Sequence, residues 1–97
     1  MTLACHLDKL EMVHFLDLMG ADINKGTGIG KNTPLMSATM KWNVRIVEYL
    51  TERGADPSIQ DKYGFTAKRK AEIKNLKTIH SMLSLYENEY TTKSKKA

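Results

Sequence analysis

The tripeptide Gly-Ala-Asp occurs twice, at Gly20-Ala21-Asp22 and Gly54-Ala55-Asp56, with a spacing of 34 residues in a chain of 97. Each copy follows an apolar segment with helical spacing, one around Met12–Leu16 and the other around Ile46–Leu50. Glycine ends a helix at low cost because it adopts the left-handed backbone conformation without steric strain. The two copies therefore predict two helix ends that lie one structural period apart.

A second signal returns with nearly the same period. Thr33-Pro34-Leu35 is followed 33 residues later by Thr66-Ala67-Lys68. Threonine is a good helix N-cap, and proline suits the first helical turn, where its missing N–H leaves no bond unmade. A fixed period near 33 residues indicates stacked repeats rather than one closed globule.

This order of threonine cap, paired helices and Gly-Ala-Asp resembles the ankyrin repeat. The resemblance implies an all-α ankyrin-repeat solenoid, in which helix-turn-helix units stack and short hairpin loops join them. It implies an ankyrin repeat domain over residues 1–90, with a partial first repeat at 1–26, a second at 27–60, a capping third at 61–90, and a flexible basic tail at 91–97. The last helix is expected at about 77–87, ending near Asn88 or running on.

Composition limits the classes of function. Net charge is +4, but Lys93, Lys95 and Lys96 lie in the last five residues, so the repeats themselves are close to neutral. No apolar run approaches the roughly 18 residues of a membrane span. The lone cysteine, Cys5, excludes an internal disulfide and favours a reducing, intracellular location, cytoplasmic or nuclear.

The two ends of the stack differ in polarity. Leu35, Thr39 and Val47 of the second unit are expected to touch the third unit, whose equivalent residues are polar. These are Lys68, Glu72 and His80, so the third unit is predicted to cap the stack. The first unit instead carries apolar residues and no hairpin, which predicts either a fragment of a longer ankyrin protein or an end that docks on a partner. The apolar residues are Met1, Leu3, Leu7, Leu10, Met12 and Phe15.

No catalytic, cofactor or metal site is expected. The loop at 25–31 is glycine-rich, but Gly30-Lys31 precedes Asn32 where a phosphate-binding loop needs Ser or Thr. The histidines do not converge with Cys5 at metal-binding spacing. The pattern therefore favours a non-enzymatic binding protein.

Trp42 occupies an unusual position. The turn between the two helices of an ankyrin repeat usually holds a glycine with positive φ, and the equivalent positions here carry Asp8, Trp42 and Asn75. Asp and Asn tolerate that conformation, but Trp does not, so the turn is either strained or differently built. Trp42 is an interface anchor or, alternatively, its ring folds back over the stack.

In ankyrin proteins the partner usually lies along the hairpin tips and inner helices. Tyr63 and Phe65 flank Gly64 at a hairpin tip, so at least one is expected to contact a partner that has apolar and acidic groups. The alternative is that one of them packs on the neighbouring hairpin. The predicted partner-binding residues are Met40, Lys41, Trp42, Lys62, Tyr63, Phe65, Ile73 and Lys74. The same transfer by position adds His6, Leu7, Ile29, Asn32 and Gln60.

The resemblance thus implies a protein–protein interaction module or scaffold that binds a protein through its concave hairpin and inner-helix face. One alternative is a structural element packed within a large assembly. Another is nucleic-acid or anionic-surface contact through the basic tail, although three lysines are too few for specific binding. Nucleic acid is therefore the least favoured partner.

Overall fold

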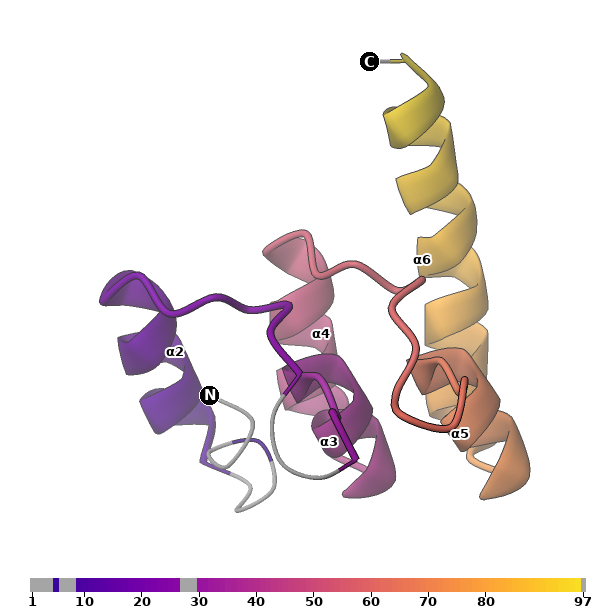
Figure 1. The fold of residues 1–97 in the computed structure, drawn as a ribbon, viewed down its shortest axis with the longest axis horizontal. Helices are drawn as coiled ribbons and strands as arrows, with labels where there is room; N and C mark the ends of the chain where they lie inside the picture. The colour runs from indigo at the N-terminus through magenta and orange to yellow at the C-terminus, as the bar shows by residue number, and fades with distance from the viewer. Residues whose placement is uncertain (1–4, 6–8, 27–29, 97) are drawn as a thin grey trace.

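The computed structural model describes Cys5, residues 9–26 and residues 30–96, with side chains as far as Thr91. Five α-helices follow one another in these ranges (Figure 1): α2 (Leu10–Leu18), α3 (Pro34–Met40), α4 (Val44–Glu52), α5 (Ala67–Ile73) and α6 (Lys77–Lys96). The described residues contain no β-strand. The all-α class predicted from the sequence is confirmed.

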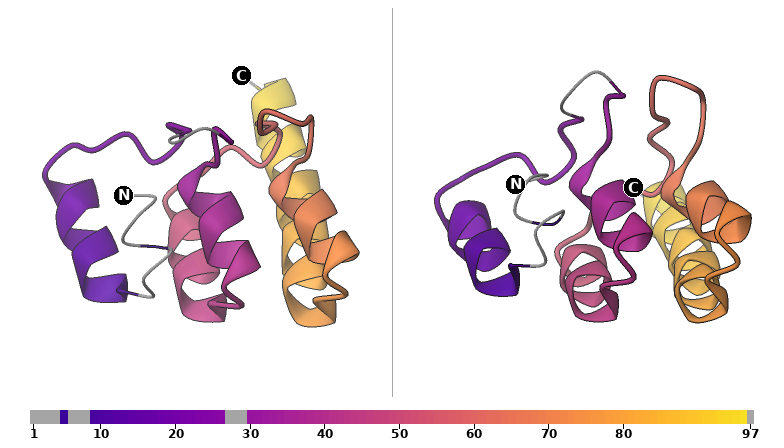
Figure 2. Two further views of the ribbon diagram at one scale, coloured as in Figure 1. Left: turned by 60° about the horizontal axis from the view of Figure 1, so that its bottom comes forward. Right: turned by 90° about the horizontal axis from the view of Figure 1, so that it is seen from below.

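The helices form two rows. Figure 2 shows α3 and α5 side by side in one row, with α2, α4 and α6 in the other. The pairs α3/α4 and α5/α6 are each joined by a short turn, and these turns lie at one edge of the stack. The segment that leads into α5 projects from the opposite edge as a hairpin loop. A backbone bond from Lys62 N to Gly30 O, 2.8 Å long, joins this hairpin to the segment before α3.

Three helices, α3, α4 and α5, begin where capping side chains satisfy free backbone N–H groups. Thr33 Oγ1 accepts from Met36 N at 3.3 Å, and Thr66 Oγ1 accepts from Arg69 N at 3.2 Å. Asn43 caps α4 in the same way. The 33-residue period in the sequence is therefore a period of N-caps.

Four helices end in the same hydrogen-bonded motif. Its central residue has positive φ, near 85–90° at Gly20 and Gly54 and 58° at Trp42 and Asn75. In each motif the N–H of this residue donates to the carbonyl three residues earlier, and the next N–H donates to the carbonyl five residues earlier. These two bonds define the Schellman cap, which satisfies carbonyls that the helix itself leaves free.

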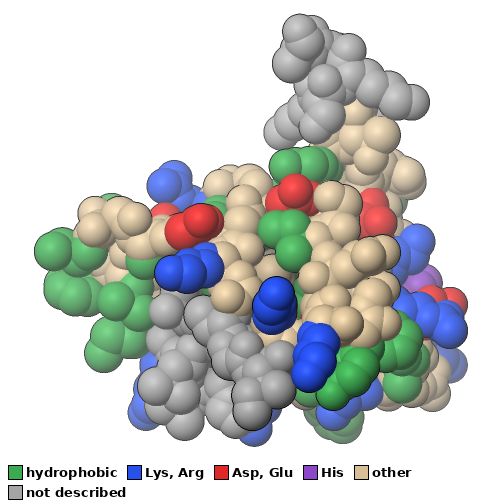
Figure 3. All heavy atoms as spheres, viewed as in Figure 1, with side chains coloured by type: hydrophobic (Ala, Val, Ile, Leu, Met, Phe, Trp, Pro, Cys, Tyr) green, Lys and Arg blue, Asp and Glu red, His purple; other side chains and the backbone are tan. Residues whose placement is uncertain are grey.

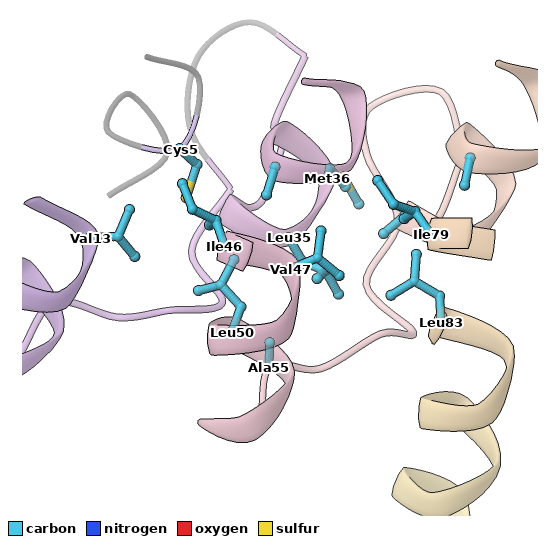
Figure 4. Packing of buried hydrophobic residues seen from close by; sticks show 13 residues of the cluster. Cys5, Val13, Leu35, Met36, Ile46, Val47, Leu50, Ala55, Ile79 and Leu83 are labelled. Atoms are coloured by element: carbon cyan, nitrogen blue, oxygen red, sulfur yellow. The ribbon is translucent and has the colours of Figure 1, made fainter. Parts of the chain in front are cut away.

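The core runs along the stack as one cluster (Figure 4). The second unit is buried most completely, and Leu35, Thr39 and Val47 have almost no exposed surface, as expected for residues between two neighbours. Cys5 and Val13 pack on one side of this unit, and Ile79 and Leu83 pack on the other. The buried hydrophobic residues are Cys5, Val13, Leu35, Met36, Ala38, Ile46, Val47, Leu50, Ala55, Ala67, Ala71, Ile79 and Leu83.

A polar network fastens α2 to α4. The largely buried Asp17 carboxylate accepts from the Tyr49 hydroxyl and from Arg53 Nε, each through Oδ2 at 2.6 Å. His14 Nδ1 lies 3.1 Å from the same hydroxyl. The Tyr49 hydrogen bond and the Arg53 charge lower the pKa of Asp17 against the opposing effect of burial. Val13 of α2 also lies in the apolar core, with Leu10 and Leu16 packed against it, so the carboxylate adds a polar link to an apolar contact.

The last helix is longer than the sequence pattern suggested. Residues 91–97 were expected to form a flexible tail, whereas α6 continues as far as Lys96. The stretch from Lys77 onward contains no Gly or Pro, so nothing in the backbone stops the helix. Tyr86 fixes its middle by donating its hydroxyl to Ala55 O, and burial raises the pKa of Tyr86 to about 12.

The two ends of the stack differ, as their residue types indicated. On α2 the side chains of Met12, Phe15, Leu18 and Met19 are 50–70% exposed and form an apolar edge, which lies at the left of Figure 3. Leu3 and Leu7, also expected at this edge, lie outside the described residues. At the other end Glu72 is exposed and Lys68 and His80 are half-buried. That the third unit closes the stack stays a prediction.

The apolar edge of α2 should make the isolated chain self-associate. We expect replacement of Phe15 and Leu18 together by Lys to weaken self-association by roughly tenfold or more, because two partly exposed apolar side chains leave the contact. Sedimentation velocity over a concentration series measures this. Leu85→Lys, which changes an exposed leucine on α6, is the control and should leave association unchanged. A wild-type chain that stays monomeric at high concentration contradicts the prediction.

The Asp17 network should make stability depend on pH. The pKa of the Asp17 carboxyl is lower in the folded chain than in the unfolded chain. The ionised carboxylate therefore stabilises the fold at pH values above its ordinary pKa, and this stabilisation is lost as the pH falls through the lowered pKa. We expect Asp17→Asn to lower the free energy of unfolding by about 1.5–3 kcal/mol at neutral pH and by progressively less in acid. Urea denaturation across the pH range tests this. Asp22→Asn, at an exposed turn, is the control and should cost less.

Candidate functional site

The hairpin tip before α5 is organised by one carboxylate. Asp61 Oδ1 accepts from the backbone N–H groups of Tyr63 and Phe65, each at 2.9 Å. Asp61 N in turn donates to Phe65 O at 2.9 Å, and Gly64 N donates to Asp61 O at 3.0 Å. Gly64 has φ of 85°, a conformation that glycine adopts readily. The tip is therefore a closed turn with a fixed backbone.

An ion pair fastens this tip to α5. Lys70 Nζ lies 2.6 Å from Asp61 Oδ2, and the two side chains are only 12% and 2% exposed. Burial acts to raise the pKa of Asp61, but the Lys70 ammonium and the two backbone N–H groups outweigh it and lower the pKa. The same ammonium lies 5.9 Å from the centre of the Phe65 ring. Contacts of Lys70 with Asp61 and Phe65, all in the third repeat, thus help to fix the position of the tip.

The two aromatic side chains of the tip have different environments. Tyr63 is 70% exposed, with Lys62 Nζ 5.9 Å from its ring centre. Phe65 is half-buried beside Lys70. Tyr63 is therefore the aromatic that the tip presents to solvent, and Phe65 helps to hold the turn.

The remaining predicted contact residues lie at the other end of the inner helices. Met40 and Lys41 end α3, Ile73 and Lys74 end α5, and all four are exposed. The seven residues of α5 rise about 10 Å, so Ile73 lies one helix length from the tip. The predicted residues thus form a tip group and a turn group. Gln60 is exposed and Asn32 half-buried, and His6, Leu7 and Ile29 lie outside the described residues.

Trp42 is both strained and exposed. Its φ of 58° and its hydrogen bonds match those of Asn75, so the turn is built as in the next repeat and the strain is real. A left-handed conformation costs a residue with a side chain roughly 1–2 kcal/mol. The side chain is 67% exposed, so burial does not offset this cost.

The described residues hold little that could support catalysis. Among them no group of three His, Cys, Asp or Glu side chains could hold a metal ion. Burial raises the pKa of the Cys5 thiol to about 12, which keeps it protonated and unreactive near neutral pH. No helix in the described part of the chain is long and apolar enough to cross a membrane.

Asp61, for which the sequence predicted no role, lies at the centre of the tip. A signal for it was present, because Asp at the first position of a turn often binds backbone N–H groups two residues on. The spacing of Asp61 and Gly64 fits such a turn. The partner Lys70 could not be recognised, because nothing in a helical lysine shows which carboxylate it reaches.

Comparisons with known proteins agree with this fold. A family model described as ankyrin repeats, in three copies, matches residues 1–94. The first unit, which the sequence analysis treated as partial, lies within the matched range.

Individual relatives share the same repeats. Over 65 residues the chain is 40% identical to Ankyrin repeat and SAM domain-containing protein 6 of Rattus norvegicus, covering 67% of this chain and 7% of that protein. The protein of the same name from Mus musculus is 38% identical over 65 residues, with the same coverage. Palmitoyltransferase AKR1 of Lachancea kluyveri is 41% identical over 58 residues, or 60% of this chain and 8% of that protein. The chain thus spans less than a tenth of each relative.

Removing the carboxylate of Asp61 should disrupt the tip. We expect Asp61→Ala to lower the free energy of unfolding by roughly 3–5 kcal/mol, because it leaves the Lys70 ammonium buried without its partner. Thermal and urea denaturation measure this. Asp56→Ala is the matched control, since Asp56 also accepts from a backbone N–H two residues on, at Ser58, but lies in an exposed turn. If the two substitutions lower the free energy of unfolding equally, Asp61 does not have the organising role in the tip that is assigned to it here.

Proposed function

The chain belongs to the ankyrin-repeat family, and from this premise we propose that it binds a protein partner through the hairpin tip and the inner helices α3 and α5. Ankyrin repeats are in general protein–protein interaction modules. One observation carries the choice of face. Tyr63 stands exposed on a turn whose backbone and position are fixed by Asp61.

The fixed backbone of the tip lowers the entropy cost of binding. An aromatic side chain on a rigid turn loses little conformational freedom when it binds, so more of the contact energy becomes affinity. Tyrosine is also among the residues that most often dominate interfaces. Lys62 beside the ring favours a partner that carries acidic groups as well as an apolar pocket.

A second contact is proposed for the apolar edge of α2. We infer that a further ankyrin repeat covers it, since each repeat buries its apolar face against a neighbour. The exposed Met12, Phe15, Leu18 and Met19 support this, as does the greater length of the relatives. A docking partner at this edge, or packing within a large assembly, is the alternative.

The proposed role is binding and not catalysis. The match to the palmitoyltransferase covers 8% of that protein, so its activity is not extended to this chain. We propose an intracellular location, cytoplasmic or nuclear, which the single buried thiol of Cys5 supports.

The partner can be sought from the proposed face. A photo-cross-linking amino acid placed at Tyr63, and at Leu85 as a matched exposed control, should capture one protein from the first position only. That protein, once purified, should bind the wild-type chain and lose about 2 kcal/mol of affinity with Tyr63→Ala, in the range of interface hot spots. Titration calorimetry measures the affinities, and thermal denaturation should show the variant folded.

Two further variants distinguish the alternatives. Tyr63→Ala with Phe65→Ala should lose at least as much affinity, although Phe65 also supports the tip and stability has to be checked. Deletion of residues 92–97 should change affinity much less. If the deletion abolishes binding while Tyr63→Ala is neutral, contact through the basic C-terminal end replaces the proposed face.

A further inference from the structure

Trp42 is the exception among the four positions that end a helix with positive φ. The other three are Gly20, Gly54 and Asn75, the residue types that adopt this conformation at least cost. The hydrogen bonds at Trp42 are the same as theirs, so the turn itself has no need of an indole. A strained residue whose side chain is 67% exposed contributes little to folding and is a candidate for function.

Trp42 borders two hollows beside the turn that joins α3 and α4. The turns between paired helices lie at the lower edge of the stack in the left panel of Figure 2. The first hollow, of about 360 Å³, is bordered by Leu10 and by the turn residues from Lys41 to Arg45. The second, of about 240 Å³, lies toward α6 and is bordered by Val44, Leu76 and residues 77–79. Trp42 and Val44 border both.

The charges around these hollows have one sign. Lys41, Arg45 and Lys77 border them, and no carboxylate does. In the described part of the chain none of the three cations takes part in a salt bridge. Glu11 and Glu72 border two neighbouring hollows, and Lys77 also borders the second of these.

We propose that Trp42 anchors a second docking surface, which receives an acidic protein segment with apolar side chains. This surface is formed by Trp42, Lys41, Val44, Arg45, Leu76 and Lys77. Apolar side chains of the segment enter the hollows beside the indole, and its carboxylates meet the three cations. The surface lies at the opposite end of α3 and α5 from Tyr63, so it goes beyond the proposed function and can act at the same time.

The lining of the hollows favours a protein segment over a nucleic acid. Apart from the indole, their apolar borders are aliphatic, from Leu10, Val44, Leu76 and Ile79. Single-stranded nucleic acids are usually held by successive aromatic rings on which bases stack. Among the described residues that border the two hollows, Trp42 supplies one such ring. Aliphatic hollows ringed by cations suit a segment that alternates Leu or Phe with Asp or Glu.

Trp42 is the only tryptophan of the chain, so its fluorescence reports on this surface alone. The probe is a synthetic peptide of repeated Glu-Leu-Asp-Phe units, added to the 97-residue chain. We expect its binding to shift Trp42 emission to the blue and to raise the anisotropy of a labelled peptide. Peptides with Lys in place of the acidic residues, or with Ser in place of Leu and Phe, should bind with an affinity at least roughly tenfold lower.

Trp42→Asn separates binding from folding, because Asn75 occupies the equivalent turn. We expect this variant to melt roughly 4–8 °C higher than the wild type, since the strain is relieved, and to bind the acidic peptide at least tenfold more weakly. A purely structural tryptophan would instead lower the melting temperature when replaced. We expect a second variant, Trp42→Gly, also to raise the melting temperature and to weaken binding of the acidic peptide.

Charge reversal tests the cations. Arg45→Glu and Lys77→Glu should each weaken peptide binding several-fold, whereas Lys25→Glu, at an exposed position distant in sequence, should not. The proposal is overturned if the acidic peptide leaves Trp42 emission unchanged at millimolar concentration or if its basic counterpart binds equally well. It is also overturned if Trp42→Asn destabilises the fold, or if oligouridine shifts Trp42 emission while the acidic peptide does not.

Discussion

The structure depends on the stacking of helix pairs, because no pair in this chain can bury its own apolar face. The second unit shows this most clearly, with Leu35, Thr39 and Val47 buried between neighbours on both sides. The outer units have one neighbour each among the described residues, and their free sides differ. One presents the apolar side chains of α2 and the other presents the polar Glu72 with the half-buried Lys68 and His80. The two ends of the stack thus differ in polarity.

Stacking also determines where binding surfaces can occur. The helix pairs fill the middle of the molecule, so the exposed irregular backbone gathers at two edges, the hairpin edge and the turn edge. At the hairpin edge the buried pair of Asp61 and Lys70 fixes the backbone and leaves Tyr63 free to point outward. At the turn edge a Schellman cap holds Trp42 in a strained but defined position. Both proposed surfaces present one exposed aromatic ring on a fixed backbone, an arrangement that lowers the entropy lost on binding.

The links between units are polar as well as apolar. Asp17 of α2 accepts from Tyr49 and Arg53 of α4, and Tyr86 of α6 donates to the carbonyl of Ala55. Lys62 and Gly30 join the hairpin before α5 to the segment before α3 through the backbone. Such bonds are directional, so they fix the register between neighbours that apolar contacts alone would leave loose. A few hydrogen bonds between groups more than thirty residues apart therefore help to fix how the units of this short stack are placed.

The sequence by itself determined the helical class, the period, and most helix starts and ends. Those features arise from bonds between residues at most five apart, such as the Thr33 and Thr66 caps and the glycine-ended helices. The sequence also identified the turn position of Trp42 and the exposed tip around Tyr63. It missed the role of Asp61, and it expected a flexible tail at residues 91–97 where α6 continues as far as Lys96. It left open whether one tip aromatic packs, and the structure places Phe65 beside Lys70. Only the tertiary structure decided which distant side chains meet, namely Asp17 with Tyr49 and Arg53, and the hollows that Leu10, Val44 and Leu76 form around Trp42. The physical reason is that local signals report how the backbone satisfies its own hydrogen bonds, whereas these contacts depend on how one repeat is placed against the next.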